Sequence, residues 1–169
     1  MSIWIKRIGL ALLAVLVVIQ FFGIDKENPP VVAKQEFMGI VSPPADVKDM
    51  LKSACYDCHS NETKYPWYSN LAPVSWWLKG HIDHGREELN FSKWGTYDAE
   101  KAAHKAEEAA EEVEEQHMPI KSYLLTHGEA RLTEEQRQRL AKWFMALADT
   151  RDVTKRVREM EVVPTAPTE

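Results

Sequence analysis

The sequence predicts an all-α protein in which one compact domain follows an N-terminal membrane helix. Apolar residues recur every three or four positions in four long segments, which is the period of an amphipathic helix. No segment shows the sustained alternation of apolar and polar residues that is typical of a strand. At 169 residues the chain is long enough for one domain with extensions, and too short for two large cores.

The first 24 residues are predicted to form a membrane anchor. A basic pair, Lys6-Arg7, precedes an uncharged run over residues 8–24, and three charged residues follow it. Such a run suits a transmembrane helix of about 17 to 20 residues whose basic flank stays in the cytoplasm. The end of the run lacks the small-x-small pattern that signal peptidase requires, so an uncleaved anchor is favoured over a cleaved signal peptide.

The remaining boundaries follow from composition. Residues 25–44 contain four prolines and no sustained helical period, which predicts a tether. The domain is expected over residues 45–149, and residues 150–169 are expected to form a flexible tail. The net charge is −5, and the exported part is more acidic still because a basic pair lies in the anchor. This charge disfavours nucleic acid as a partner.

A helix is predicted over residues 46–58, with Asp46 as its N-cap. Its apolar spacing places the two cysteines of the chain, Cys55 and Cys58, on one face. They belong to the sequence Cys-Tyr-Asp-Cys-His, the attachment pattern for c-type haem. Thiols three residues apart can add to the two vinyl groups on one porphyrin edge, while the imidazole of His59 reaches the iron.

Two other chemistries use a Cys-x-x-Cys pair. A thioredoxin-like redox site would need a preceding strand in a βαβ pattern, and a structural zinc site would need a second ligand pair at regular spacing. Neither pattern is visible in the sequence. We therefore expect one covalent haem c per chain, with a disulfide or a metal site as the alternatives.

Further blocks accompany the haem motif. They are Tyr65-Pro-Trp-Tyr-Ser-Asn, Ala72-Pro-Val-Ser-Trp-Trp, His81, Gly85-Arg86, Leu89-Asn-Phe-Ser-Lys-Trp94, Met118-Pro119, Tyr123, His127 and Leu-Thr-x-x-x-x-x-x-Leu-x-x-Trp from Leu132 to Trp143. In these blocks the chain resembles the small haem-binding domain family of bacterial c-type cytochromes, over about residues 43–148. The resemblance implies haem binding and a redox role. Because c-type maturation takes place on the outer side of the bacterial inner membrane, we expect a domain that faces the periplasm or the cell exterior.

Three more helices are predicted, over residues 72–88, 98–117 and 133–149. Asp98 is the expected N-cap of the second of these, and Thr133 lies in the start signal of the third. The terminal helix is expected to pack against the helix that enters the haem motif, as in cytochrome c-like folds.

Met118 is the leading candidate for the sixth iron ligand. It lies in a Met-Pro pair after a long helix and before the terminal helix, as the axial methionine does in many mono-haem cytochromes c. Ligation by Met and His raises the reduction potential, which suits an electron carrier. His81, in an aromatic helical stretch, is the main alternative. His84, His117, His127 or an open site are the others.

The surroundings of the haem are predicted from the aromatic blocks. Residues expected to line the haem edge and exclude water are Tyr65, Pro66, Trp67, Tyr68, Trp76 and Trp77. The carbonyl of Pro66 or Pro73 is expected to accept a hydrogen bond from the second nitrogen of His59. Arg86 is expected either to pair with a haem propionate or to form a surface salt bridge.

Together these features predict outer-sphere electron transfer with redox partner proteins in or at the membrane. The sequence has no recognisable nucleophile-base-orienter set and no second haem motif, so we do not expect an enzyme. Two alternatives remain open. One is a haem-based ligand or redox sensor with a displaceable sixth ligand, and the other is a non-catalytic haem subunit of a respiratory complex.

Overall fold

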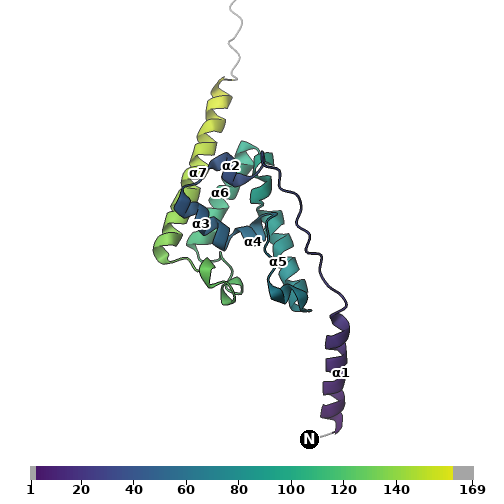
Figure 1. The fold of residues 1–169 in the computed structure, drawn as a ribbon. Coiled ribbons are helices and arrows are strands. Elements are labelled where there is room, and N and C mark those ends of the chain that lie inside the picture. Colours follow the sequence, from purple (N-terminus) through teal and green to yellow (C-terminus); the bar gives the residue numbers. More distant parts are fainter. Residues whose placement is uncertain (1–2, 162–169) are drawn as a thin grey trace, which may run out of the picture.

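The structure, a computed structural model, describes residues 3–161. This part of the chain folds into helices with no strand, which confirms the predicted all-α class. Figure 1 shows α1 (Ile3–Ile19) projecting from a cluster of helices. The longer helices of the cluster are α3 (Ala45–Ala54), α5 (Val74–Glu88), α6 (Ala99–Glu114) and α7 (Glu134–Glu161). Shorter helices connect them: α2 (Phe37–Val41), α4 (Tyr56–His59), η1 (Trp67–Asn70), η2 (Phe91–Thr96), η3 (Tyr123–Leu125) and η4 (Gly128–Ala130).

The N-terminal helix is shorter than the predicted membrane span. α1 ends at Ile19, although the uncharged run continues to Ile24. Between residues 3 and 161 no helix has both the length and the apolar character needed to cross a membrane. The transmembrane helix predicted in the first 24 residues is therefore not confirmed. None of the residues of α1 is buried against the rest of the protein.

The segment predicted to be a tether is bound to the domain at several points. Asn28 donates from its Nδ2 to the carbonyl of Thr63 at 2.9 Å, and the carbonyl of Pro30 accepts from Nδ2 of Asn61 at 3.1 Å. Phe37 of α2 is fully buried, with its ring centroid 4.9 Å from that of Phe91 and 4.8 Å from that of Trp94. The segment thus supplies part of the core.

The helix predicted over residues 46–58 is interrupted at Cys55. α3 begins at Ala45 with Pro44 in the N-cap position, so Asp46 lies in the first turn instead of capping the helix. Cys55 has a φ of −124° and separates α3 from α4. The two cysteines therefore do not lie on one continuous helix, which corrects the predicted stripe.

The capping signals of the last two helices are confirmed. Asp98 accepts a hydrogen bond of 2.8 Å from the amide of Lys101 at the start of α6. At the start of α7, Oε1 of Gln136 accepts from the backbone amide of Thr133 at 2.9 Å, and Oγ1 of Thr133 accepts from the backbone amide of Gln136 at 3.2 Å, which forms a capping box. α6 ends at Glu114, before the predicted end at residue 117.

α7 is the longest helix and extends beyond its predicted end. It continues to Glu161, through residues that were expected to belong to the flexible tail. Residues 162–169 of that tail lie outside the described part of the chain. α7 packs chiefly along α6 and also contacts α3, where Arg139 pairs with Asp46 at 3.1 Å. This contact confirms that the terminal helix packs against the helix that enters the haem motif.

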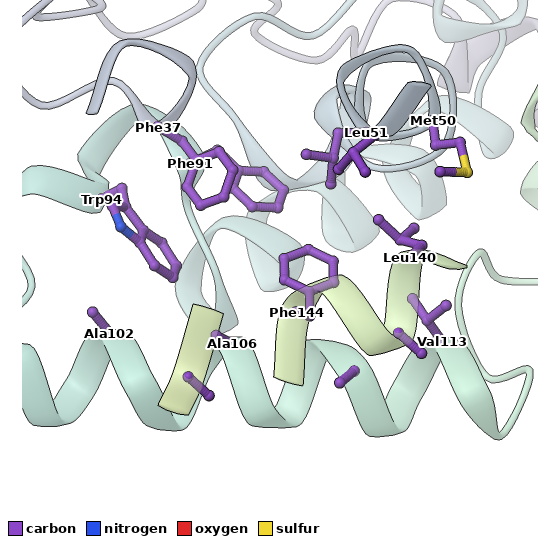
Figure 2. Close-up of a cluster of buried hydrophobic side chains, with 14 of the residues drawn as sticks. Phe37, Met50, Leu51, Phe91, Trp94, Ala102, Ala106, Val113, Leu140 and Phe144 are labelled. Atoms are coloured by element: carbon purple, nitrogen blue, oxygen red, sulfur yellow. The ribbon is translucent and has the colours of Figure 1, made fainter. Parts of the chain in front are cut away.

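The core lies where α6 and α7 meet the helices of the haem motif (Figure 2). Alanines at a spacing of four residues, Ala102, Ala106 and Ala110, form the buried face of α6. Their small side chains let larger ones from α7 pack against this face, including Phe144, which is 1% exposed.

Candidate haem site

A cavity of about 480 Å³ opens between α3, α4, α5, α6 and α7. Its size lies within the range of about 300 to 1,000 Å³ that is usual for cofactor and ligand sites. The apolar part of its lining consists of Ala54, Leu89, Phe91, Ala109, Val113 and Phe144. The part that carries polar, ionisable or sulfur groups consists of Cys55, His59, His84, Glu88, Lys105, Glu108, Glu111, Glu112 and Met118.

His59 is held in one tautomer by the end of α5. Its Nδ1 lies 2.8 Å from the carbonyl oxygen of Gly85 and 3.2 Å from that of Leu89. A carbonyl only accepts, so Nδ1 carries the hydrogen and the lone pair of Nε2 is available for a metal. Burial lowers the pKa of His59, which favours the neutral imidazole that iron requires. The predicted acceptors, the carbonyls of Pro66 and Pro73, are wrong, because Nδ1 faces the carbonyls at the end of α5 instead.

Gly85 makes this close packing possible. A Cβ atom at this position would lie 3.0 Å from the carbonyl oxygen and 3.3 Å from the Cβ of Cys58. The absence of a side chain therefore lets α5 approach α4 closely enough for its carbonyl to reach His59.

Both cysteines are half-buried, free thiols. Cys55 lines the cavity, whereas Cys58 borders a much smaller neighbouring pocket. Burial, with a contribution from Cys58, raises the pKa of Cys55 to about 12. Burial and the Asp57 carboxylate raise the pKa of Cys58 to about 11. These shifts disfavour the reactive thiolate of a thioredoxin-like site, which requires a lowered pKa.

Met118 lines the same cavity as His59, and its backbone is held on both sides. Gln116 has a left-handed φ of 63°, which turns the chain after α6, and the amide of Met118 donates to the carbonyl of Glu112 at 2.9 Å. From α7, Nη1 of Arg137 donates to the carbonyls of Val113 at 2.9 Å and of Met118 at 3.2 Å. These hydrogen bonds hold the backbone of Met118 in the cavity wall.

Of the histidines considered as alternative sixth ligands, only one lines the cavity. His81 does not line the cavity; its Nδ1 lies 2.9 Å from the carbonyl of Trp77, on whose ring it packs at 4.2 Å. His117 is exposed, and His127 stacks on the ring of Tyr123. His84 does line the cavity, but it comes from α5, the helix that also holds His59. Met118 and His84 are thus the candidates that the fold brings to the cavity.

The aromatic residues predicted to line the haem edge lie elsewhere. Trp67 is 75% exposed, and Trp76 and Trp77 are also exposed. They belong to η1 and the first turns of α5, whereas the cavity lies at the other end of α5. Tyr65 does not line the cavity either, and its buried hydroxyl has no hydrogen-bond partner in the described part of the chain. Two residues of this block, Pro66 and Tyr68, border the small pocket beside Cys58.

Arg86 connects two segments of the chain through hydrogen bonds. Its Nε donates to the carbonyl of Ser60 at 2.8 Å, and its Nη2 donates to Asn28 Oδ1 at 2.7 Å and to Thr63 Oγ1 at 2.9 Å. It does not line the cavity. The guanidinium thus joins the segment before α2 to the loop after the haem motif by hydrogen bonds instead of the expected surface salt bridge, and its pairing with a propionate stays a prediction.

Two basic residues of the site, Lys105 and Arg137, are not among those predicted from the sequence. Lys105 lines the cavity with its side chain only 15% exposed, and it pairs with Glu108 at 2.7 Å and Glu88 at 3.6 Å. The hydrogen bond to Glu108 raises the pKa of Lys105. The helical period of the sequence could have indicated Lys105, because it lies three residues after Ala102 on the buried face of α6. Nothing in the sequence marks Arg137, whose role depends on the turn that brings Met118 beside α7.

The lining fits a haem group. A cavity with an apolar wall holds a cysteine of the attachment motif, a histidine whose Nε2 can bind iron, and a methionine whose backbone accepts a hydrogen bond from Arg137. This combination defines the site as one for haem. The sequence matches the family of haem-binding domains over residues 14–146, and the chain belongs to this family. No curated protein and no solved structure matched the chain.

Proposed function

We propose that the protein is a membrane-attached, mono-haem c-type cytochrome that transfers electrons. The observation that carries the proposal is that Cys55, His59 and Met118 line one cavity, although Met118 is far from the motif in the sequence. Cys55 and Cys58 would attach the haem covalently, and His59 and Met118 would ligate the iron. Bound haem supplies the one-electron redox centre.

The residues of the chain support transfer without bond-making. The Gly85 carbonyl orients the ring of His59, and Arg137 holds the backbone of Met118. Because hydrogen bonds to the protein orient both residues, both would stay bound to the iron when its oxidation state changes. This favours outer-sphere electron transfer over substrate binding at the metal. Apolar lining residues such as Leu89 and Phe144 exclude water and help to set the potential. The protein would then not be an enzyme.

The acidic residues at the mouth of the cavity favour a redox partner with a basic surface. Glu108, Glu111 and Glu112 line it, while Lys105 is already paired with two carboxylates. A surface of this sign attracts a partner with a basic face and makes the association rate depend on salt. We infer that such a partner, in or at the membrane, exchanges electrons with the site.

Attachment to the membrane is supported by α1. Its 17 residues have no contact that buries them, and apolar side chains such as Leu10 and Leu12 are exposed around it. From Ile8 to Ile19 this helix carries no charged residue, and a helical segment that is apolar on all sides is stable when lipid covers it. Because c-type haem is attached outside the cytoplasm, we place the protein at the inner membrane of a bacterium, with the domain facing the periplasm or cell exterior.

Expression with the c-type maturation machinery tests the attachment. The chain should carry one haem that stays bound after denaturation, and the variant Cys55→Ala/Cys58→Ala should carry none that does. A wild-type chain that gains no covalent haem would refute the proposal.

Spectra test the sixth ligand and separate an electron carrier from a sensor. The ferrous wild type should not bind carbon monoxide readily, Met118→Ala should bind it, and His81→Ala and His84→Ala should behave like the wild type. If His84→Ala alone opens the site, the Met118 assignment is wrong. If the wild type binds the gas as readily as Met118→Ala, a haem-based sensor becomes the better hypothesis.

A further inference from the structure

An exposed aromatic patch lies at the start of α5, on the side of the domain where α1 ends. Five apolar residues form it, and we call it the tryptophan face: Trp67, Leu71, Val74, Trp76 and Trp77, with exposed fractions of 75%, 45%, 44%, 41% and 49%. None of these residues lines the haem cavity. Tryptophan side chains in water leave a large apolar area uncovered, so a patch of this kind indicates an interaction surface.

The tryptophan face is joined to the end of α1 by hydrogen bonds. Nε1 of Trp76 donates to the carbonyl of Phe22 at 2.7 Å, and the side chain of Gln20 is doubly bonded to the backbone of Ala72. Figure 1 shows the beginning of α5 beside the end of α1. Phe21 and Phe22, between α1 and the domain, are 84% and 62% exposed. The exposed apolar surface is therefore continuous from α1 to the tryptophan face.

The charge around this surface differs from that of the whole chain. No Asp or Glu occurs between Glu62 and Asp83, whereas Lys64 and Lys79 lie in this interval, and the chain as a whole has a net charge of −5. Lys26 also reaches this region, where its Nζ donates to Asn70 Oδ1. Of these lysines, Lys79 pairs with Asp83, which follows the interval. Aromatic rings with nearby lysines match the headgroup region of a bilayer that contains anionic lipid.

We propose that the tryptophan face lies in the headgroup region of the membrane to which α1 attaches, so that the domain has one orientation on the bilayer. This inference rests on the proposed membrane attachment. Along α5, Trp76 and the cavity residue His84 are separated by eight residues, a rise of about 12 Å. The docked domain would hold its haem cavity above the lipid surface, where its acidic mouth stays open to a partner.

The experiment is hydroxyl-radical footprinting of the full haem-loaded chain in vesicles of phosphatidylethanolamine and phosphatidylglycerol, read by mass spectrometry. Flotation of the vesicles first measures attachment. The variant Leu71→Glu/Val74→Glu places two acids on the tryptophan face, and Leu125→Glu, at a residue that is 80% exposed in η3, is the matched control. Unchanged haem spectra would establish that each variant is folded. If the double variant misfolds, the single variant Val74→Glu replaces it.

All chains should float with the vesicles because each keeps α1. In the wild type and in Leu125→Glu, Trp67 and Trp77 should be modified about fivefold more slowly than in the double variant. Equal rates in floating wild type and double variant would overturn the docking proposal and leave the attachment standing. Protection that disappears when the ratio of protein to lipid is lowered would also overturn it, since a second copy would then cover the face. A wild type that does not float would overturn the attachment itself.

Discussion

Replacement of Arg86 by alanine is expected to destabilise the fold and to leave the haem environment nearly unchanged. The guanidinium makes three hydrogen bonds, to Ser60, Asn28 and Thr63, at 2.7 to 2.9 Å. It connects the segment before α2 to the loop after the haem motif and does not line the cavity. Its loss should therefore loosen that connection.

The expected loss of stability depends on the hydrogen bonds that Thr63 and Asn28 keep after Arg86 is removed. A hydrogen bond to a charged group contributes about 1.5 to 3 kcal/mol. Without Arg86, Thr63 Oγ1 still donates to the carbonyl of Asp57, and Asn28 Nδ2 still donates to that of Thr63. The half-buried site also admits water to the vacated groups. We expect the free energy of unfolding to fall by about 2 to 4 kcal/mol in total, well below three full bonds.

Urea denaturation of the full haem-loaded chain in mild detergent measures this effect. Arg139→Ala is the control, because Arg139 forms an exposed ion pair with Asp46 and its loss should cost about 0 to 1 kcal/mol. Arg86→Lys should restore little, since a lysine lacks the planar fork that serves several acceptors. An Arg86→Ala variant with wild-type stability and a shifted reduction potential would refute the reasoning and favour contact with a propionate.

Three further predictions concern the core and the walls of the cavity. Phe37→Ala should lower the free energy of unfolding by about 3 to 5 kcal/mol because Phe37 is fully buried; the exposed control Val32→Ala should change it by about 0.5 kcal/mol or less in urea denaturation. Gly85→Ala should reduce the yield of covalent haem per chain, since the new Cβ meets Cys58, whereas Gly80→Ala, with open space around it, should not. Arg137→Ala should release the Met118 loop and increase carbon monoxide binding by the ferrous protein, though less than Met118→Ala does. Gln138→Ala, which loses only an exposed bond to Glu134, should bind as little gas as the wild type.

Several features of the fold could be predicted because they depend on neighbours within a few residues. The Asp98 cap and the capping box at Thr133 each join groups three residues apart, so the sequence alone places the starts of α6 and α7. The interruption at Cys55 could not be predicted in this way, because the apolar spacing continues through it. Similarly, the proline-rich segment carries no helical period, yet one of its residues, Phe37, reaches the core.

By itself the sequence determined the all-α class, the membership of a haem-binding family and the local Cys-Tyr-Asp-Cys-His motif, because periodicity and motif spacing are properties of short segments. Only the tertiary structure decided what surrounds that motif. The acceptor for His59 is 26 residues away, the cavity joins Met118 to the motif and leaves out His81, and the tryptophans lie beside the end of α1 instead of beside the cavity. Each of these relations arises from the packing of helices that are distant in the chain, and no local pattern specifies which faces of two such helices will meet.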